Sequence, residues 1–446
     1  MKIIQVHNHY LQPGGEESVV QEELALLKEH GHAVSSYAMH NTNLKGWKAL
    51  VTGSLKSIWN WSVYREFRIR LQQERPDIVH CHNIFPQISP SIYWACRKEG
   101  VPVVQTLHNY RLLCLNAFLF RQHHGTKGDV SGIGSDVGSD PGPRRGRTDR
   151  AGGAICELCA AKRFKWPGVI HRCYRQSVPA SLVVALILFV HTLLRTWSRM
   201  VCSYIVLTEF QKDKLCQAGL DPARVRVKPN FVRTSDAARR LEQNADERQQ
   251  ISRTALYVGR LSPEKGGVTL LMAWREFSEG WIRAHGEDSS APALMIVGDG
   301  PERMKLEAYA HRQGMNNSVH FAGRKSREEV YTLMRDALFL VSPSICYETF
   351  GMVVIEAGMQ GTPSIVGEPG AASNLIEDGQ TGLLYPLGDS RALAAKLRWA
   401  YMHPEEMAAM GQRVKGVCQD TYSQQKNYEM LMEIYNEAIS LGGAAG

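Results

Sequence analysis

Short apolar runs alternate with segments of helical spacing along most of this chain, and that alternation restricts the fold more than any other feature. A polar, strongly charged segment at 234–253 divides the apolar runs into two sets. The expected strands are Lys2–Val6, Ala33–Tyr37, Asp77–His80, Val101–Leu107, Tyr204–Leu207 and Val225–Val227, then Ala255–Val258, Ala293–Val297, Val319–Phe321, Ala337–Val341, Thr362–Val366 and Gly382–Tyr385. Strands that alternate with helices are typical of parallel sheets covered by helices on both faces. We therefore predict an α/β protein with two doubly wound, Rossmann-like domains facing a central cleft.

The length of 446 residues suffices for two domains with separate cores. We place the N-terminal domain at 1–230 and the C-terminal domain at 231–446. The final segment, Thr421–Ile439, has apolar residues at helical spacing, and we expect it to pack back on the N-terminal domain. Residues 122–154 are rich in Gly, Asp, Ser and Arg, which predicts a disordered surface insertion.

The formal net charge of +8 is mild for this length and suits an acidic ligand or an anionic membrane surface without requiring nucleic acid. Basic residues between 45 and 75 are interleaved with Trp47, Trp59 and Trp61. This pattern suits an anionic bilayer or a lipid-linked phosphate, and stacking on nucleic acid is a second option. A solvated helix with packed tryptophans is the simplest interpretation, and we favour it.

The most apolar stretch, Val178–Leu194, is short for a membrane span, which needs ~20 residues. Small and polar residues recur along it at helical spacing, so we expect a buried or interfacial helix. The N-terminus runs directly into a strand-like segment and has no secretory apolar region. We expect a cytoplasmic protein, with peripheral contact to the inner face of the plasma membrane as an option.

Four of the ten cysteines bracket the 122–154 insertion: Cys114 before it, and Cys156, Cys159 and Cys173 after it. Without a secretory signal, clustered cysteines bind metal more often than they form disulfides. One Cys-x-x-Cys pair with two further thiolates can supply a tetrahedral zinc site. The spacing departs from common zinc patterns, so a structural zinc and simple packing both remain open.

Polar pairs follow three of the expected N-terminal strands: His7-Asn8, His82-Asn83 and His108-Asn109. The carboxyl ends of parallel strands share one edge of a sheet, where ligands bind. We therefore predict that these histidines line a site. Gly14 and Gly15 precede the first helix, where a glycine lets backbone N–H groups approach a phosphate; a plain glycine turn is the alternative.

The segment Pro343–Pro363 follows the apolar run Ala337–Val341 and combines a loop with Glu348 and a helix-like stretch with Glu356. Both carboxylates would flank a helix N-terminus, whose N–H groups favour an anion such as a diphosphate. A carboxylate can accept two hydrogen bonds from a sugar diol. Arg260 and Lys265 follow the first strand of the second set and could neutralise a diphosphate.

In order along the chain, these stretches resemble the family 4 glycosyltransferases, which have the two-domain GT-B fold. The resemblance covers nearly the whole chain and is carried by GGEE at Gly14, HNYRLLCLNA at His108, LTEF at Leu207, GRLSPEKG at Gly259, VGDGP at Val297 and ETFGMVVIE at Glu348. The HNYRLLC and CELC stretches look like a subgroup that makes surface polysaccharides and exopolysaccharides. The insertion is longer than expected for it, and Lys228–Phe231 replaces the family's Asn-Gly turn.

The resemblance implies a retaining, metal-independent hexosyltransferase without a catalytic cofactor, which moves a sugar from a nucleotide-diphosphate sugar to a glycan or lipid-linked acceptor. The N-terminal domain would bind the acceptor and the C-terminal domain the donor. Arg260, Lys265 and Gly15 would contact the diphosphate, Glu356 the ribose and Glu348 the sugar. His108 would lie near the reacting carbon, and backbone amides would help to hold sugar and phosphate: Phe350, Gly351, Met352 and Val353.

Two other classes remain as alternatives. A nucleotide-sugar 2-epimerase shares the architecture and needs no acceptor, although the cations of GRLSPEKG are not part of its usual pattern. A non-enzymatic basic protein that binds membrane or nucleic acid would leave the Glu348 and Glu356 arrangement unexplained. Because the sequence has no Asp-x-Asp clamp, Arg260, Lys265 and a helix N-terminus must meet the charge of the leaving diphosphate.

Overall fold

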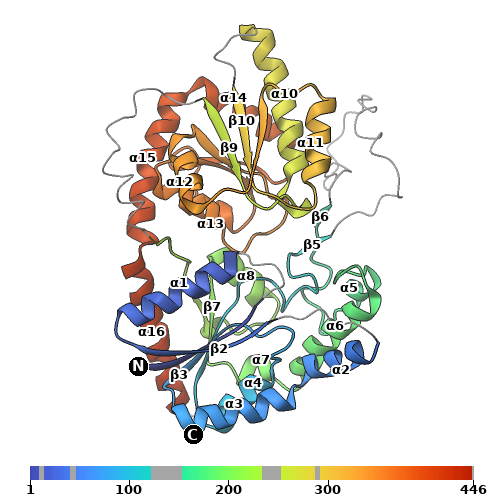
Figure 1. The fold of residues 1–446 in the computed structure, drawn as a ribbon, viewed down its shortest axis with the longest axis vertical. Helices are drawn as coiled ribbons and strands as arrows, with labels where there is room; N and C mark the ends of the chain where they lie inside the picture. The colour runs from blue at the N-terminus through green and yellow to red at the C-terminus, as the bar shows by residue number, and fades with distance from the viewer. Residues whose placement is uncertain (10–14, 41–46, 122–152, 234–252, 287–291, 444–446) are drawn as a thin grey trace. The chain divides into compact units, whose positions relative to one another are not determined.

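The computed structural model describes residues 1–9, 15–40, 47–121, 153–233, 253–286 and 292–443, without the side chains of 47–51 and 443. These residues form two compact units (Figure 1). Unit 1 contains Met1–Leu119, Glu157–Arg233 and Tyr422–Gly446, and unit 2 contains Phe120–Cys156 and Thr234–Thr421. Each unit is a parallel sheet with packed helices, so the predicted α/β class with two doubly wound sheets is confirmed.

Unit 1 is built on six parallel strands in the order β2-β1-β3-β4-β7-β8. The order reverses between β1 and β3, which makes the carboxyl ends of these strands the topological switch point. The strands are β1 Lys2–His9, β2 Ala33–His40, β3 Ile78–Asn83, β4 Val103–Thr106, β7 Ser203–Val206 and β8 Val225–Val227. The helices are α1 Gly15–Glu29, α2 Trp47–Ile58, α3 Trp61–Glu74, α4 Ser91–Lys98, α5 Trp166–Ile170, α6 Val178–Leu193, α7 Thr196–Arg199, α8 Glu209–Gln217 and α16 Gln424–Gly443.

Helix α16 is the segment that we expected to return to the N-terminal domain. Its apolar residues Leu431, Ile434, Tyr435 and Ala438 join one buried cluster with residues of β1, α1, β3, β4 and β7. The Tyr435 hydroxyl also lies 2.8 Å from His80 Nδ1 on β3. The chain therefore completes the core of unit 1 with its last helix, after it has formed unit 2.

Unit 2 has the strand order β11-β10-β9-β12-β13-β14, with its switch point between β9 and β12. Its largest fully buried side chain is Trp274 on α10, packed with Phe277 and Tyr401. The strands are β9 Thr254–Val258, β10 Ala293–Val297, β11 Val319–Gly323, β12 Phe339–Ser342, β13 Ser364–Glu368 and β14 Gly382–Pro386. The helices are α10 Gly267–His285, α11 Arg303–Arg312, α12 Arg327–Asp336, α13 Met352–Met359, α14 Ser390–Met402 and α15 Pro404–Thr421.

The predicted insertion at 122–154 lies outside the described residues except at its end. Ala154, which we had assigned to it, pairs with Arg121 in a small antiparallel ribbon of β5 Phe120–Arg121 and β6 Ala154–Ile155. The apolar stretch from Val178 forms α6, which buries one face and exposes Leu182 and Leu193. Among the described residues, no helix combines the length and hydropathy that a bilayer crossing needs.

Candidate functional site

Two loops meet at the switch point of unit 2. The first leaves β9 and forms a short 3₁₀ turn, Pro263–Lys265, before α10. The second leaves β12 and carries Ser344 and Glu348. The Ile345 N–H donates to the Glu264 carbonyl at 2.9 Å, which joins the loops. Gly266 has a φ of +70° and a side chain there would collide with the Pro343 carbonyl, so this close approach requires glycine.

Lys265 and Glu348, which the sequence predicted separately, contact each other. Lys265 Nζ lies 2.5 Å from Glu348 Oε1, and the Ser344 hydroxyl donates to the same oxygen at 2.5 Å. Burial works to raise the pKa of Glu348, but the Lys265 charge and the two hydrogen bonds outweigh it and lower that pKa. Burial likewise opposes the charged form of Lys265, yet Glu348 raises the pKa of this ammonium group. Lys265 and Glu348 therefore form an ion pair in which both groups stay charged. The Lys265 ammonium group is the cation of this pair that could face an anionic ligand.

Helix α13 begins directly after this pair. Gly351 caps it with a φ of +113°, a conformation that favours glycine, and the helix starts at Met352 as its pattern predicts. Phe350 is buried, whereas Met352, Val353 and Glu356 are half-buried. Glu356 lies in the second turn, as expected. Arg260 is exposed just beyond the end of β9. Backbone amides, two cations and two carboxylates thus lie on segments that follow the carboxyl ends of β9 and β12.

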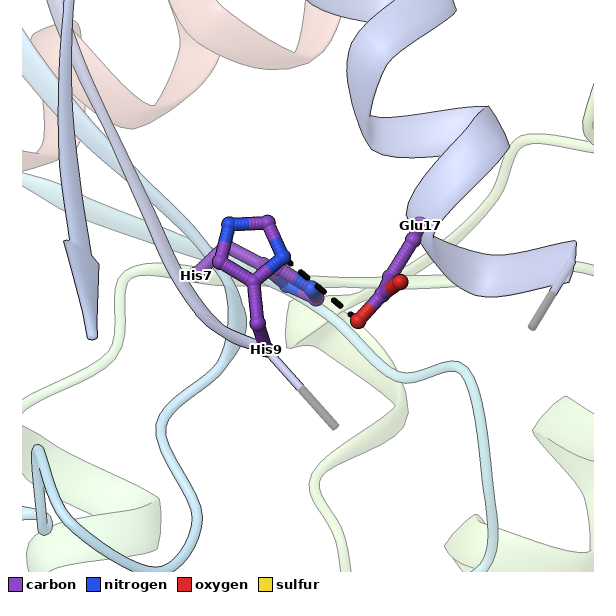
Figure 2. A group of neighbouring side chains, drawn as sticks. All are labelled: His7, His9 and Glu17. Carbon is purple, nitrogen blue, oxygen red and sulfur yellow. Dashed lines mark ion pairs between the residues drawn. The ribbon is translucent and has the colours of Figure 1, made fainter. Parts of the chain in front are cut away.

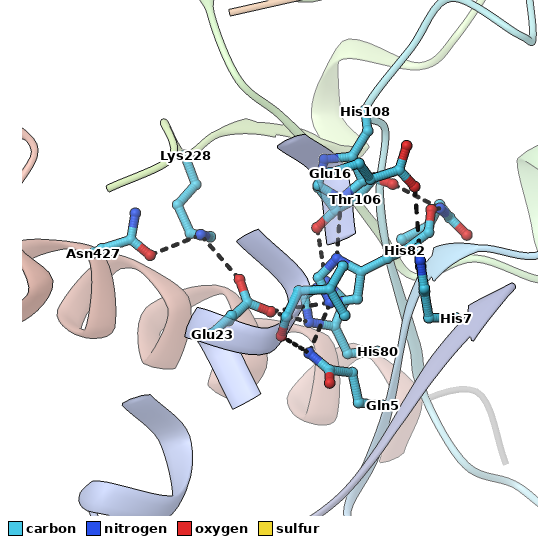
Figure 3. A network of polar contacts seen from close by, with 12 residues as sticks. Gln5, His7, Glu16, Glu23, His80, His82, Thr106, His108, Lys228 and Asn427 are labelled. Atoms are coloured by element: carbon cyan, nitrogen blue, oxygen red, sulfur yellow. Dashed lines mark hydrogen bonds and ion pairs between the residues drawn. The ribbon is translucent and has the colours of Figure 1, made fainter. Parts of the chain in front are cut away.

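The histidines at the strand ends of unit 1 gather at its switch point, as Figure 3 shows. His82 Nδ1 lies 3.0 Å from His108 Nε2, and the rings of His82 and His7 have centroids 6.5 Å apart. Asn83 donates from Nδ2 to the Asn8 carbonyl at 2.8 Å, which holds β3 against β1. Burial, and next the neighbouring His82, lower the pKa of His108 well below its usual value. His108 is therefore a neutral imidazole at neutral pH.

The sequence did not predict the buried carboxylate of Glu23, which contacts the histidines of this cluster. Glu23 on α1 is 2% exposed, with Oε1 3.0 Å from His80 Nδ1 and 3.2 Å from His82 Nε2. Its Oε2 lies 3.2 Å from Nζ of the equally buried Lys228 (Figure 3). A signal was present, because Glu23 shares the apolar face of α1 with Val19, Val20, Leu26 and Leu27.

The structure describes only one of the two glycines that we predicted near a phosphate. Gly14 lies outside the described residues, whereas Gly15 is the exposed first residue of α1. A Cβ at Gly15 would meet no atom of the described residues within 4 Å, so these residues leave room there. The LTEF stretch has a structural role, because the Thr208 hydroxyl caps α8 by accepting from the Gln211 N–H at 3.2 Å.

The four cysteines named for a zinc site differ in their surroundings. Cys114 is buried and its thiol donates to Asn116 Oδ1 at 2.9 Å, and Cys159 is also buried. Lys165, 6% exposed, donates from Nζ to the Cys159 carbonyl at 2.9 Å. Burial lowers the pKa of Lys165, and the nearby thiols of Cys159 and Cys114 oppose that shift. Cys156 and Cys173 are half-buried. The structural zinc stays a prediction that metal analysis has to test.

Two family models match the chain. The model described as Glycosyl transferases group 1 matches residues 239–417, and the one described as Glycosyltransferase Family 4 matches residues 13–129. Among curated relatives, D-rhamnosyltransferase WbpZ of Pseudomonas aeruginosa is 35% identical over 27% of this chain and 32% of its own length. Alpha-D-kanosaminyltransferase of Streptomyces kanamyceticus is 26% identical over 54% of this chain and 61% of its own length. The matched part of the chain thus spans about a third to three-fifths of these relatives.

Solved structures match over almost the whole chain. Sucrose-phosphate synthase from Thermosynechococcus elongatus has a TM-score of 0.63 at 17% identity, and the match covers 99% of both chains. HepE of Anabaena, in complex with UDP and glucose, has a TM-score of 0.59 at 16% identity and covers 97% of this chain and 98% of its own. At such identities the likeness shows the fold alone.

Proposed function

We propose that this chain, which belongs to the family 4 glycosyltransferases and has their GT-B fold, transfers a sugar from a nucleotide-diphosphate sugar to a glycan or lipid-linked acceptor. The observation that carries the proposal is the Lys265–Glu348 contact at the switch point of unit 2. In doubly wound sheets, ligands bind beyond the carboxyl ends of the strands at that point. The complex of HepE with UDP and glucose supports a donor of this class.

Each donor group has a matching partner in unit 2. Lys265 would meet the diphosphate as a point charge and Arg260 as a bidentate fork. The N-terminus of α13 adds N–H groups that suit the same anion. Glu348 would then share Lys265 with the phosphate and accept from a sugar hydroxyl, while Glu356 would accept from the ribose. These groups stabilise the charge that develops on the leaving diphosphate.

Calorimetry with UDP, GDP and ADP tests the donor site, with a short DNA duplex as the negative control. We expect one nucleotide to bind and Lys265→Ala or Arg260→Ala to weaken binding by roughly 2–4 kcal/mol, the range for a lost charge-assisted contact to phosphate. Lys325→Ala is the matched control, because Lys325 has the same 35% side-chain exposure as Lys265 and also pairs with a glutamate. Equal affinity of Lys265→Ala and the wild type would remove the diphosphate assignment.

We propose that transfer retains the anomeric configuration and that the diphosphate needs no metal. Inversion needs a base on the face opposite the leaving group, whereas Glu348 accompanies the diphosphate cation Lys265. The acceptor hydroxyl would attack from the front face and pass its proton to a diphosphate oxygen. NMR of the first-formed glycoside should show an α linkage from an α donor; a β linkage would refute the mechanism. UDP affinity should be equal with and without EDTA.

A role in surface polysaccharide or exopolysaccharide synthesis would bring the protein to a lipid-linked acceptor. Trp59 packs against Trp61, Tyr64 and Trp94, but Trp61 and Leu55 are each 62% exposed, and Lys56 and Arg65 are exposed beside them in sequence. We propose that this surface contacts anionic lipid peripherally. Flotation with vesicles that contain phosphatidylglycerol should capture the protein, and Trp61→Ser should reduce capture. Equal recovery with neutral vesicles would argue against the electrostatic part.

A further inference from the structure

A group of metal-ligating side chains lies at the end of β1 and the start of α1. His7 and His9 are two residues apart on β1 and therefore point to the same face of the strand. Glu17 lies in the first turn of α1. One ligand atom of each residue lies within 4.8 Å of the other two, and Figure 2 shows the three side chains converging. Of the residues expected to bind the donor, Gly14 and Gly15 precede Glu17 in unit 1, and the others belong to unit 2.

The surroundings of the His7 side chain indicate a bound ligand more strongly than those of His9 or Glu17. His7 is 2% exposed, and neither of its ring nitrogens has a hydrogen-bond partner among the residues that the structure describes. The nearest carboxylate oxygen to Nδ1, from Glu16, is 4.0 Å away, which is too far for a hydrogen bond. Leaving a buried polar atom unsatisfied destabilises the fold, so such an atom in a folded protein needs an explanation. A bound cation would satisfy one of the two orphaned nitrogens of His7 by accepting its lone pair, and no described side chain does so.

The distances suit a small ion. His9 Nδ1 lies 3.4 Å from Glu17 Oε1. Ligand bonds of ~2.0–2.2 Å to a tetrahedral ion place neighbouring ligand atoms about 3.3–3.6 Å apart. The side chains of His9 and Glu17 are 20% and 14% exposed, so the group is not fully enclosed. Two imidazoles with one carboxylate favour a first-row transition metal such as Zn²⁺ over Mg²⁺ or Ca²⁺.

We propose that His7, His9 and Glu17 bind a divalent transition-metal ion and leave at least one coordination position open for water or a ligand oxygen. The other group of close ligating residues in the described parts of the chain, Glu23 with His80 and His82, does not suit a metal. There Lys228 already supplies the positive charge, 3.2 Å from Glu23, and His80 Nε2 is bonded to the Thr106 hydroxyl at 2.7 Å.

Cobalt(II) is the probe that separates this site from the cysteines. Protein without a histidine tag is stripped with chelator, titrated with Co²⁺ and followed by absorption spectroscopy. We expect about one equivalent to bind with the weak visible bands of nitrogen and oxygen ligands, because structural and catalytic sites of this size hold one ion. Thiolate ligands would instead add strong near-ultraviolet charge-transfer bands. A mutant with both Cys114→Ser and Cys159→Ser should keep the weak bands.

Two partly exposed ligands are mutated to avoid disturbing the core. His9→Ala and Glu17→Gln should each reduce Co²⁺ affinity on the order of 100-fold, at least as much as the loss of a residue that only orients a ligand. Glu22→Gln, in the same helix but outside the group, should bind as the wild type does. Zn²⁺ should raise the thermal midpoint of the wild type and not that of His9→Ala. Unchanged Co²⁺ affinity in both ligand variants, or a spectrum of thiolate bands alone, would overturn the proposal.

Discussion

Glu23 shows how a single buried charge can connect distant parts of the chain. Its carboxylate on α1 lies within 3.2 Å of groups on β3 and of Lys228, which follows β8. Lys228 in turn donates to Asn427 Oδ1 on α16 at 2.9 Å. Burial works to raise the pKa of Glu23, but His80, Lys228 and His82 outweigh it and lower that pKa. The carboxylate is thus held ionised inside unit 1, next to the histidines that lead to His108.

Replacing only Glu23 or only Lys228 should strongly destabilise the folded protein. Glu23→Gln leaves the Lys228 ammonium buried without its counter-charge, so we expect the free energy of unfolding to fall by about 3–5 kcal/mol. Lys228→Met should have a comparable effect. The double mutant should lose less than the sum of the single mutants, because neither charge is then left alone. Urea unfolding followed by tryptophan fluorescence measures all four proteins, and additive losses would contradict the pairing.

At the scale of elements, the sequence predicted the strands well because buried parallel strands are nearly continuous apolar runs. It also predicted the start of α13, since Gly351 precedes an apolar helix pattern. It did not predict the ribbon of β5 and β6, whose two-residue strands are too short for any periodicity. The sequence also did not predict which distant residues contact each other. Lys265 and Glu348 are 83 positions apart, and only the folded sheet brings their loops together.

A mutation in the apolar face of α16 can test whether this helix stabilises unit 1. Leu431 is fully buried against the sheet, so Leu431→Ala should reduce the free energy of unfolding by about 2–5 kcal/mol through the cavity it leaves. Leu441→Ala is the matched control, because Leu441 lies on the same helix and is 52% exposed. That change should stay within about 0.5 kcal/mol.

Hydrogen exchange can show which unit the loss of Leu431 affects. Protection should fall in β1, β3 and β4, whose residues share the buried cluster with Leu431. Peptides from β9 and β12 should keep their protection, because the core cluster of unit 2 contains no residue of α16. Loss of protection confined to α16 itself would mean that this helix only rests on unit 1.

At the scale of the whole molecule, the two units share one architecture but differ in acid–base chemistry. Unit 1 buries four histidines, none of which is more than 3% exposed: His7, His80, His82 and His191. Among the described residues of unit 2, no histidine is buried. Burial and then the neighbouring His82 lower the pKa of His80 to about 4, and burial also lowers the pKa of His191. Acid should therefore act on the two units differently.

The lowered histidine pKa values determine whether the stability of unit 1 rises or falls with pH. Between pH 6.5, the ordinary pKa of histidine, and the lowered values near 4, the unfolded chain binds more protons than the folded one. Stability must then fall as the pH falls through this window. At pH 5, His80 alone should reduce the free energy of unfolding of unit 1 by about 2 kcal/mol, from roughly 1.36 kcal/mol per pH unit. Glu23, whose pKa is lowered, stays ionised in this range and adds no loss.

We therefore predict that unit 1 loses stability before unit 2 when the pH is lowered from 7.5 to 5. Hydrogen exchange, corrected for the intrinsic effect of pH on exchange, should show weakened protection in β1, β3 and β4 and little change in β9, β10 and β12. A His80→Gln variant, which cannot titrate at this position, should show a smaller difference between the two pH values even if it is less stable overall. Equal losses in both units, or an earlier loss in unit 2, would show that the buried histidines do not govern the acid response.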